Sequence, residues 1–120
     1  MLDSEIQHLV EFDKIIEKLK NNPESKSATI CFANPEHDMK HSPCIISLDV
    51  KIRNGKIVGN AFFRSQDAGK KFYADIMCIG EIMKLVSNKL GLEVGTLSIF
   101  IASLHIYESD FDKIKRICNL

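Results

Sequence analysis

A cysteine, an arginine–serine pair and a histidine–tyrosine pair are the residues of this chain best suited to chemistry. Cys44 is followed 20 positions later by Arg64 and Ser65, and His105 and Tyr107 stand two positions apart. A thiolate is a strong nucleophile, and nearby positive charge favours its formation. In a strand, residues two apart leave the same face. Each residue also has an ordinary interpretation, such as a small buried cysteine or a core histidine.

A β-hairpin is expected to bring Cys44 close to the arginine–serine pair. Apolar and polar residues alternate before Asn54-Gly55, a dipeptide that favours a two-residue type I′ turn, and the return strand runs over residues 57–64. Regular pairing places Cys44 opposite Ser65 and points Arg64 to the other face, unless a bulge rotates it. The same register predicts these facing pairs: Ile52 with Ile57, Val50 with Gly59, Leu48 with Ala61, and Ile46 with Phe63.

The segment after the return strand reads Arg-Ser-Gln-Asp-Ala-Gly over residues 64–69. Such a turn before a helix can offer a guanidinium, a hydroxyl and backbone N–H groups to a phosphate. The alternative is a solvated turn. Asp75 lies early in the next helix, where it is either a polar group in need of a partner or an exposed first-turn acid.

Hydrophobic periodicity predicts the elements that carry these residues. Helices are expected over residues 3–20, from residue 70 or 71 to 90, and from residue 110 onward. Strands are expected over residues 28–33, on both arms of the hairpin, and over residues 94–107. The apolar 94–107 strand suggests burial on both faces. The second helix, apolar over much of its surface and ending at Gly91, is expected to be largely buried.

The predicted fold is therefore a single α+β domain over residues 1–120, with a mainly antiparallel sheet, one long buried helix and flanking helices. A domain of this size buries a modest core, so help from a partner subunit is expected. Sixteen basic residues balance sixteen acidic ones, which gives no support to general nucleic-acid binding.

The chain also gives expectations for location and metals. We expect no secretory signal and no membrane span, because the first residues are acidic and no apolar run approaches about 20 residues. Four scattered cysteines without a Cys-x-x-Cys motif fit a reducing cytoplasm. His37, Asp38 and His41 lie in one loop without a clear further ligand, so no metal site is expected.

Taken together, Pro43-Cys44, Arg64-Ser65 with Asp67, and His105-Ile106-Tyr107 resemble the nucleotide-binding half of thymidylate synthase and its pyrimidine hydroxymethylase relatives. The resemblance runs from about residue 22 to residue 117 and includes Asn22-Pro23-Glu24-Ser25. One motif alone is weak, but the joint spacing is specific.

The resemblance implies a role for each residue. Cys44 would add to C6 of a pyrimidine, so that C5 becomes a carbanion able to attack a one-carbon donor. Arg64 and Ser65 would hold phosphate, with Asp67 as the acid that follows, and His105 and Tyr107 would hold the sugar. Asp75 stands where thymidylate synthases carry Asn to read uracil and cytosine-specific hydroxymethylases carry Asp. This residue favours a cytidine-type monophosphate.

Several positions depart from the family's pattern. Lys26-Ser27 replaces two arginines that reach across the dimer, so only Lys26 of a partner subunit would contact phosphate. Lys70-Lys71-Phe72-Tyr73 replaces a segment that shapes the folate pocket. The family's N-terminal part, with its catalytic glutamate, and its C-terminal lid have no counterpart. Methylenetetrahydrofolate is thus doubtful, and the cofactor is left open.

The leading hypothesis is a pyrimidine nucleotide-binding homodimer, with C5 one-carbon transfer or hydroxymethylation if it is an enzyme. Whether it catalyses a reaction is left open. One alternative is a catalytically inactive binder that senses or sequesters a nucleotide. Another is a structural partner of a fuller relative.

Overall fold

The computed structural model describes residues 2–34 and 43–120, with side chains in the first helix described from Val10 onward. The main elements are α1 (Leu2–Asn21), β1 (Thr29–Cys31), β2 (Ile45–Arg53), β3 (Lys56–Phe63), β4 (Gln66–Asp67), α2 (Phe72–Leu90), β5 (Glu93–Ile101), β6 (Leu104–His105), the short 3₁₀ helix η1 (Glu108–Asp110) and α3 (Phe111–Cys118). The chain is therefore α+β, as predicted.

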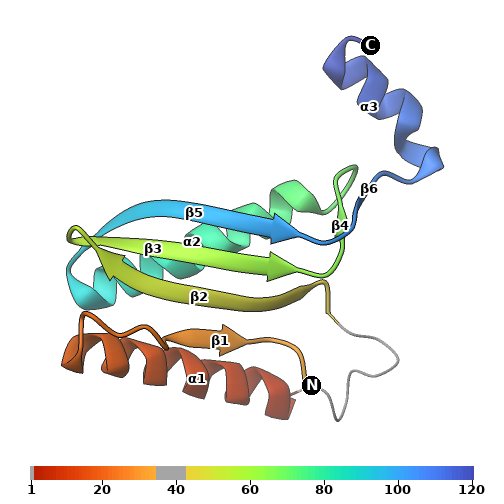
Figure 1. Ribbon diagram of the computed structural model, residues 1–120. Helices are drawn as coiled ribbons and strands as arrows, with labels where there is room; N and C mark the ends of the chain where they lie inside the picture. Colours follow the sequence, from red (N-terminus) through yellow and green to blue (C-terminus); the bar gives the residue numbers. More distant parts are fainter. Residues whose placement is uncertain (1, 35–42) are drawn as a thin grey trace.

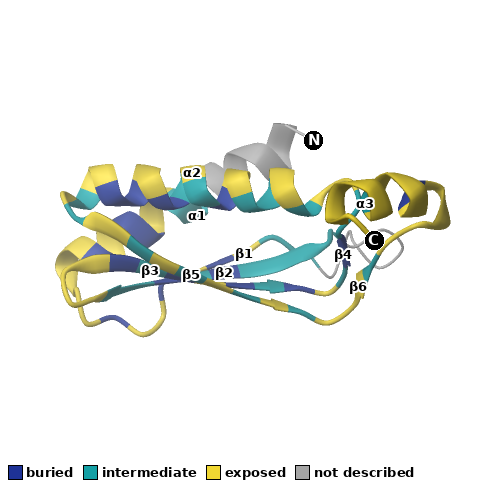
Figure 2. Ribbon diagram, turned by 90° about the horizontal axis from the view of Figure 1, so that it is seen from above, coloured by how far each residue is buried: buried dark blue, intermediate teal, exposed yellow. Residues whose placement is uncertain are grey.

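The main sheet has the order β1-β2-β3-β5 (Figure 1). The pairs β1–β2 and β2–β3 are antiparallel, and β3–β5 is parallel. The sheet is thus mixed, with antiparallel pairs in the majority. Helices α1 and α2 both lie over one face, and no helix or strand of the described residues covers the other (Figure 2). The short strands β4 and β6 pair in parallel beyond the ends of β3 and β5.

The core lies between the two helices and the covered sheet face. Leu48, Val50 and Ile57 have no exposed surface, and Leu19 and Met83 pack over them from the helices. The predicted alternation along the hairpin is the cause, since every second residue of β2 and β3 points toward the helices.

The hairpin confirms the predicted turn and most of the predicted register. Asn54 and Gly55 have φ values of 52° and 73°, the left-handed conformation that a type I′ turn requires. Ile52 faces Ile57, Val50 faces Gly59 and Leu48 faces Ala61. The expected alternation of pairs therefore holds over the inner part of the hairpin.

The outer part of the hairpin differs from the prediction, because a β-bulge interrupts the ladder between Ile45 and Ser47. Phe63 faces Ile45 and not Ile46, and the N–H of Arg64 donates to the carbonyl oxygen of Cys44 at 2.9 Å. The prediction that Cys44 lies opposite Ser65 is wrong, since the extra residue shifts the register by one.

The predicted strand over residues 94–107 is also wrong, because the chain forms two strands in two sheets. β5 ends at Ile101, and Ala102 and Ser103 separate it from β6. Their backbone groups bond to other segments: Ala102 N–H donates to Phe63 O and Ser103 O accepts from Gln66 N–H. β5 is not buried on both faces, since it is an edge strand whose residues alternate between half-buried and exposed.

The long helix α2 is less buried than predicted. It ends where expected, with Gly91 in the left-handed conformation at φ 68°. Only Ile79, Met83, Val86 and Ser87 are buried, however, and Tyr73 is 77% exposed. Met77 and Leu85 are exposed as well. One side of the helix packs on the sheet, and within the described residues nothing covers the other side.

The molecule is an open slab. Its radius of gyration is 16.2 Å and its extents are 50 × 35 × 22 Å. A compact domain of this length has a radius of about 14 Å. Helix α3 projects away from the sheet and contributes to the extension (Figure 1).

His37, Asp38 and His41 lie outside the described residues. Within residues 2–34 and 43–120, no cluster of three potential metal ligands occurs. In the same part of the chain, no helix is long and apolar enough to cross a membrane.

Candidate functional site

The residues predicted to do chemistry gather at one end of the main sheet, where β3 and β5 finish and β2 begins. β3 and β5 are parallel, so their carboxyl ends meet there, and β2 begins at the same end because it is antiparallel to β3 (Figure 1). Cys44 precedes β2, Arg64 and Ser65 follow β3, and the β4–β6 ladder carries Asp67 and His105. Topology thus brings together residues that are up to 61 positions apart in the chain, from Cys44 to His105.

Cys44 and Arg64 lie opposite one another at the mouth of the hairpin. Besides the backbone bond from Arg64 N–H to Cys44 O, the guanidinium Nε donates to the carbonyl oxygen of Pro43 at 3.0 Å. The Cys44 side chain is half-buried and packs against the edge of the core. Because of the bulge, Arg64 pairs with Cys44, whereas a regular ladder would pair Ser65 with Cys44.

Ser65 and His105 are in side-chain contact. The Ser65 hydroxyl oxygen lies 3.5 Å from His105 Nδ1, and the His105 ring meets the Tyr107 ring edge-on with centroids 5.1 Å apart. The contact depends on the short ladder, in which Ala68 N–H also donates to His105 O at 2.9 Å. The Ser65 hydroxyl thus contacts the His105 imidazole, which in turn contacts the largely exposed Tyr107 ring.

Asp67 shapes the turn that follows. Its Oδ1 accepts hydrogen bonds from the N–H groups of Gly69 at 2.9 Å and Lys70 at 3.2 Å, and the residue is buried. Asp110, also buried, is 3.4 Å from the Lys70 ammonium and closes the turn from the other side. Asp67 therefore has an evident structural function, and direct contact with a ligand stays a prediction.

Asp75 is joined to the site by a residue that the sequence did not single out, Gln66. The Gln66 side chain is 1% exposed, and its amide nitrogen donates to Asp75 Oδ2 at 2.9 Å. The amide oxygen accepts from Asp67 N–H, also at 2.9 Å. The neighbouring residues in the sequence do not indicate the Gln66–Asp75 contact, because the contact depends on how α2 packs beside β4.

Comparison with known proteins agrees with this geometry. The thymidylate synthase family model matches residues 3–119. The chain belongs to the thymidylate synthase family.

Individual relatives match over most of this chain. A Methanosarcina barkeri protein with the provisional description thymidylate synthase is 36% identical over 109 residues, covering 89% of this chain and 50% of its own. The corresponding Methanocaldococcus jannaschii protein is 33% identical over 114 residues, covering 88% and 51%. The chain thus spans about half the length of the curated relatives it matches.

Lys26 is the one predicted site residue that this fold keeps apart from the others. It precedes β1, and its carbonyl oxygen accepts from Lys51 Nζ at 3.4 Å, toward the far end of β2. Lys51 lies seven residues further along the chain than Cys44, a span of about 23 Å in an extended strand. Within one chain of this family member, Lys26 does not reach the site, so a role for it requires a second subunit.

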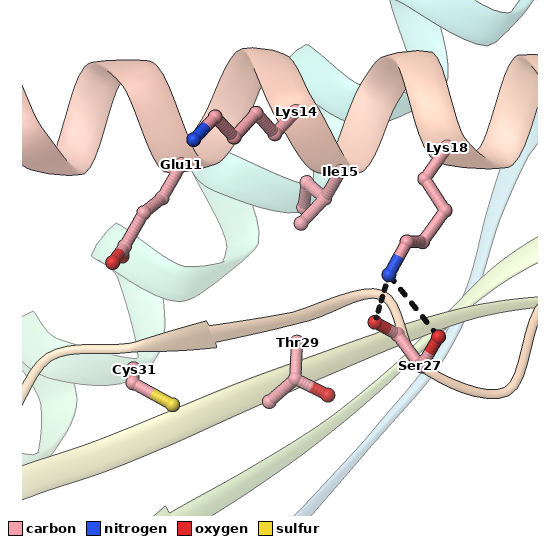
Figure 3. Close-up of a pocket in the computed structure, with 7 residues that line it drawn as sticks. All are labelled: Glu11, Lys14, Ile15, Lys18, Ser27, Thr29 and Cys31. Atoms are coloured by element: carbon pink, nitrogen blue, oxygen red, sulfur yellow. Dashed lines mark hydrogen bonds between the residues drawn. The ribbon is translucent and has the colours of Figure 1, made fainter.

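Two cavities lie away from the candidate site. One, of about 220 Å³, opens between α1 and β1, where Lys18 Nζ donates to the carbonyl and the hydroxyl oxygen of Ser27 (Figure 3). The other, of about 320 Å³, is an apolar groove between α2 and β5 that includes Met77 and Leu97. Neither contains any of the residues predicted to bind nucleotide.

Proposed function

We propose that this member of the thymidylate synthase family binds a cytidine-type nucleoside monophosphate. The site lies at the start of β2, the end of β3 and the short strand β6. The observation that carries the proposal is the placement of Cys44 opposite Arg64, next to a serine that contacts His105. Arg64 and Ser65 bind the phosphate, since a guanidinium and a hydroxyl both donate to its oxygens. His105 and Tyr107 bind the sugar hydroxyl groups.

Asp75 supports the preference for cytosine. Gln66 occupies its Oδ2, and Oδ1 has no hydrogen-bond partner within the described residues. A carboxylate oxygen only accepts, so it pairs with the exocyclic amino group of cytosine and not with the O4 carbonyl of uracil. Asp75 is half-buried, and a bound base that left its Oδ1 enclosed without a partner would be strongly disfavoured.

In the proposed reaction, the Cys44 thiolate forms a bond to C6 of the pyrimidine. The electron pair of the C5–C6 double bond moves to C5, which then takes a proton from solvent. Loss of the original C5 proton and expulsion of the thiolate restore the double bond. This cycle exchanges the C5 hydrogen without any one-carbon donor.

The turn before α2 gives no support to methylenetetrahydrofolate binding. Lys70 is paired with Asp110, and a Cβ on Gly69 would lie 3.2 Å from Asp110 Oδ2, so the turn is filled by its own side chains. The proposed exchange at C5 requires no folate.

The open sheet face supports a homodimer. Phe62 and Phe100 stack at a centroid distance of 5.7 Å on the face opposite the helices, and Phe100 is 65% exposed. Pairing of two such faces would cover these rings and would bring the partner's β1 segment, which carries Lys26, against this sheet.

A reaction test separates catalysis from binding. The protein is incubated with 5-fluoro-CMP and 5-fluoro-dCMP and its intact mass is measured, and C5 exchange of CMP and dCMP is followed in deuterated water. We expect an adduct and exchange that Cys44→Ser abolishes and that Cys78→Ser, on exposed α2 surface, retains. Absence of both signals despite nucleotide binding would refute the C6 addition.

A non-catalytic nucleotide binder is the second candidate. Cys44 packs against the core, and Arg64 Nε donates to the Pro43 carbonyl oxygen. Both observations favour a site that holds a ligand without attacking it. Binding that Arg64→Ala removes and Cys44→Ala retains, with no C5 exchange, would support this function.

A structural partner of a fuller relative is the third candidate. The exposed apolar side of α2, with Tyr73, Met77 and Leu85, supports it. A stable hetero-complex without nucleotide binding would favour this function over both others.

A further inference from the structure

Gln66 stands between the phosphate-binding pair and Asp67, and its side chain is enclosed by the protein. Both ends of its amide are engaged, one by a backbone N–H and the other by the Asp75 carboxylate. The group is therefore a built part of the site, although it is buried too deeply to be a principal contact for a nucleotide.

The backbone determines which way the amide faces. The N–H of Asp67 can only donate, so the atom 2.9 Å from it must be the carbonyl oxygen of Gln66. The NH₂ group is then forced toward Asp75, where it donates to Oδ2. Amide orientation is often ambiguous, but here the neighbouring donor leaves a single consistent assignment.

A donor fixed at this place determines what residue 75 presents on its other side. A carboxylate accepts from Gln66 through Oδ2 and presents Oδ1, a second acceptor. An asparagine at position 75 would use its carbonyl oxygen for the same bond and would present its NH₂ group, a donor. Residue 66 thus sets the polarity of residue 75 whenever that residue is an amide.

We infer that Gln66 is a positioning residue for base selectivity: it engages one oxygen of Asp75 so that the other is presented to cytosine, and it would orient an amide at position 75 toward uracil. The inference rests on the proposed nucleotide site and deepens it. Gln66 acts through Asp75 rather than on the ligand, so its effect is on the choice of base. Where residue 75 is an amide, replacing the donor at position 66 by an acceptor should reverse the base preference.

Two substitutions should therefore change the base preference in opposite directions. Asp75→Asn with Gln66 intact presents a donor and should prefer uracil. Adding Gln66→Glu keeps an acceptor for Asp67 N–H and also accepts from the NH₂ group of the asparagine introduced at position 75. The carbonyl oxygen of that asparagine then faces the ligand, and the preference should return to cytosine.

The test measures dissociation constants for CMP and UMP by calorimetry. We expect the native protein to prefer CMP by at least about 100-fold, Asp75→Asn to prefer UMP, and the double variant Gln66→Glu, Asp75→Asn to prefer CMP again. Gln66→Glu alone sets two carboxylates against each other and should weaken CMP binding by about tenfold or more. Asn88→Asp, the same amide-to-acid change on exposed α2 surface, should leave both constants unchanged.

The outcomes separate the inference from the proposed function. A double variant that binds nucleotide but keeps the UMP preference of Asp75→Asn would overturn the inference alone. A native protein that binds neither CMP nor UMP would refute the nucleotide site and, with it, the base assignment. Rescue by a second substitution cannot come from a general loss of stability, and thermal melting of each variant checks that it is folded.

A ligand-free measurement examines the same contact. The side-chain amide protons of Gln66, assigned by their loss in Gln66→Leu, should shift in the NMR spectrum of Asp75→Ala. Unchanged Gln66 resonances in that variant would overturn the inference even if nucleotide binding is intact.

Discussion

The backbone N–H of Arg64 donates to the carbonyl oxygen of Cys44 at 2.9 Å, so the two residues share a rung of the β2–β3 hairpin. A regular ladder from the Asn54-Gly55 turn would set Ser65 in that place. One extra residue in β2 makes the difference. Bulges re-aim side chains in many sheets, and here the bulge determines which residue pairs with Cys44.

Removal of the Arg64 guanidinium should weaken CMP binding. Charge-assisted hydrogen bonds contribute about 1.5–3 kcal/mol, so Arg64→Ala should raise the dissociation constant by about 10- to 100-fold. Arg53→Ala removes the same group at the far, exposed end of the hairpin and serves as the matched control. Calorimetry with CMP compares the two. Equal effects of both variants would show that overall charge, not the site, is responsible.

Removal of the Tyr107 hydroxyl should also weaken binding, because that group is proposed to contact the sugar. One neutral hydrogen bond is worth about 0.5–1.5 kcal/mol, so Tyr107→Phe should cost about threefold to tenfold in CMP affinity. Tyr73→Phe is the control, since Tyr73 is the other tyrosine of the chain and is exposed on α2. An unchanged affinity in Tyr107→Phe would remove the phenol from the site.

Gly95 should be intolerant of a side chain. A Cβ there would lie 3.0 Å from the carbonyl oxygen of Ile57, a backbone atom that cannot move aside alone. Gly95→Ala should destabilise the fold by about 1–3 kcal/mol in urea unfolding. Gly80→Ala is the opposite case, because a Cβ meets nothing within 4 Å and alanine is the better helix former, which gains about 0.5–1 kcal/mol. Stabilisation by both changes would contradict the close approach of β5 to β3.

A charge on the open sheet face should disrupt the proposed dimer. Phe100→Lys places an ammonium at the centre of the Phe62–Phe100 patch, so sedimentation should show the mass of a single chain where the native protein shows twice that mass. Leu85→Lys adds the same charge at an exposed position of α2 and should leave the dimer intact. A native protein that sediments as a monomer at micromolar concentration would refute the dimer itself.

The sequence predicts the features of the fold that depend on residues close together in the chain. Asn54-Gly55 adopts the two positive φ values of its turn, and Gly91 ends α2 in the left-handed conformation. The alternation from Leu48 to Ile52 set the register of three residue pairs. In each case, the residues that determine the structure are neighbours in the chain.

The features that the sequence did not predict depend on distant segments. Ile45 and Ile46 are the same residue type, so no local preference says which leaves the ladder at the bulge. The Gln66–Asp75 bond requires α2 to pack beside β4. The sequence predicts too much burial for α2 and β5, because an apolar surface indicates that it needs to be covered but does not indicate which chain covers it.

The order of the strands carries a consequence for how the molecule opens. β2 and β3 have hydrogen-bonded neighbours on both sides, whereas β1 and β5 are edges and β6 is held by a two-residue ladder. Amide hydrogen exchange is slowest where opening requires global unfolding, so protection should be greatest in the β2–β3 hairpin. Cys44 and Arg64 lie at the open end of this protected hairpin. His105 lies in the two-residue β4–β6 ladder, where we expect faster exchange. A ligand bridging them would slow exchange at His105 far more than at Leu48.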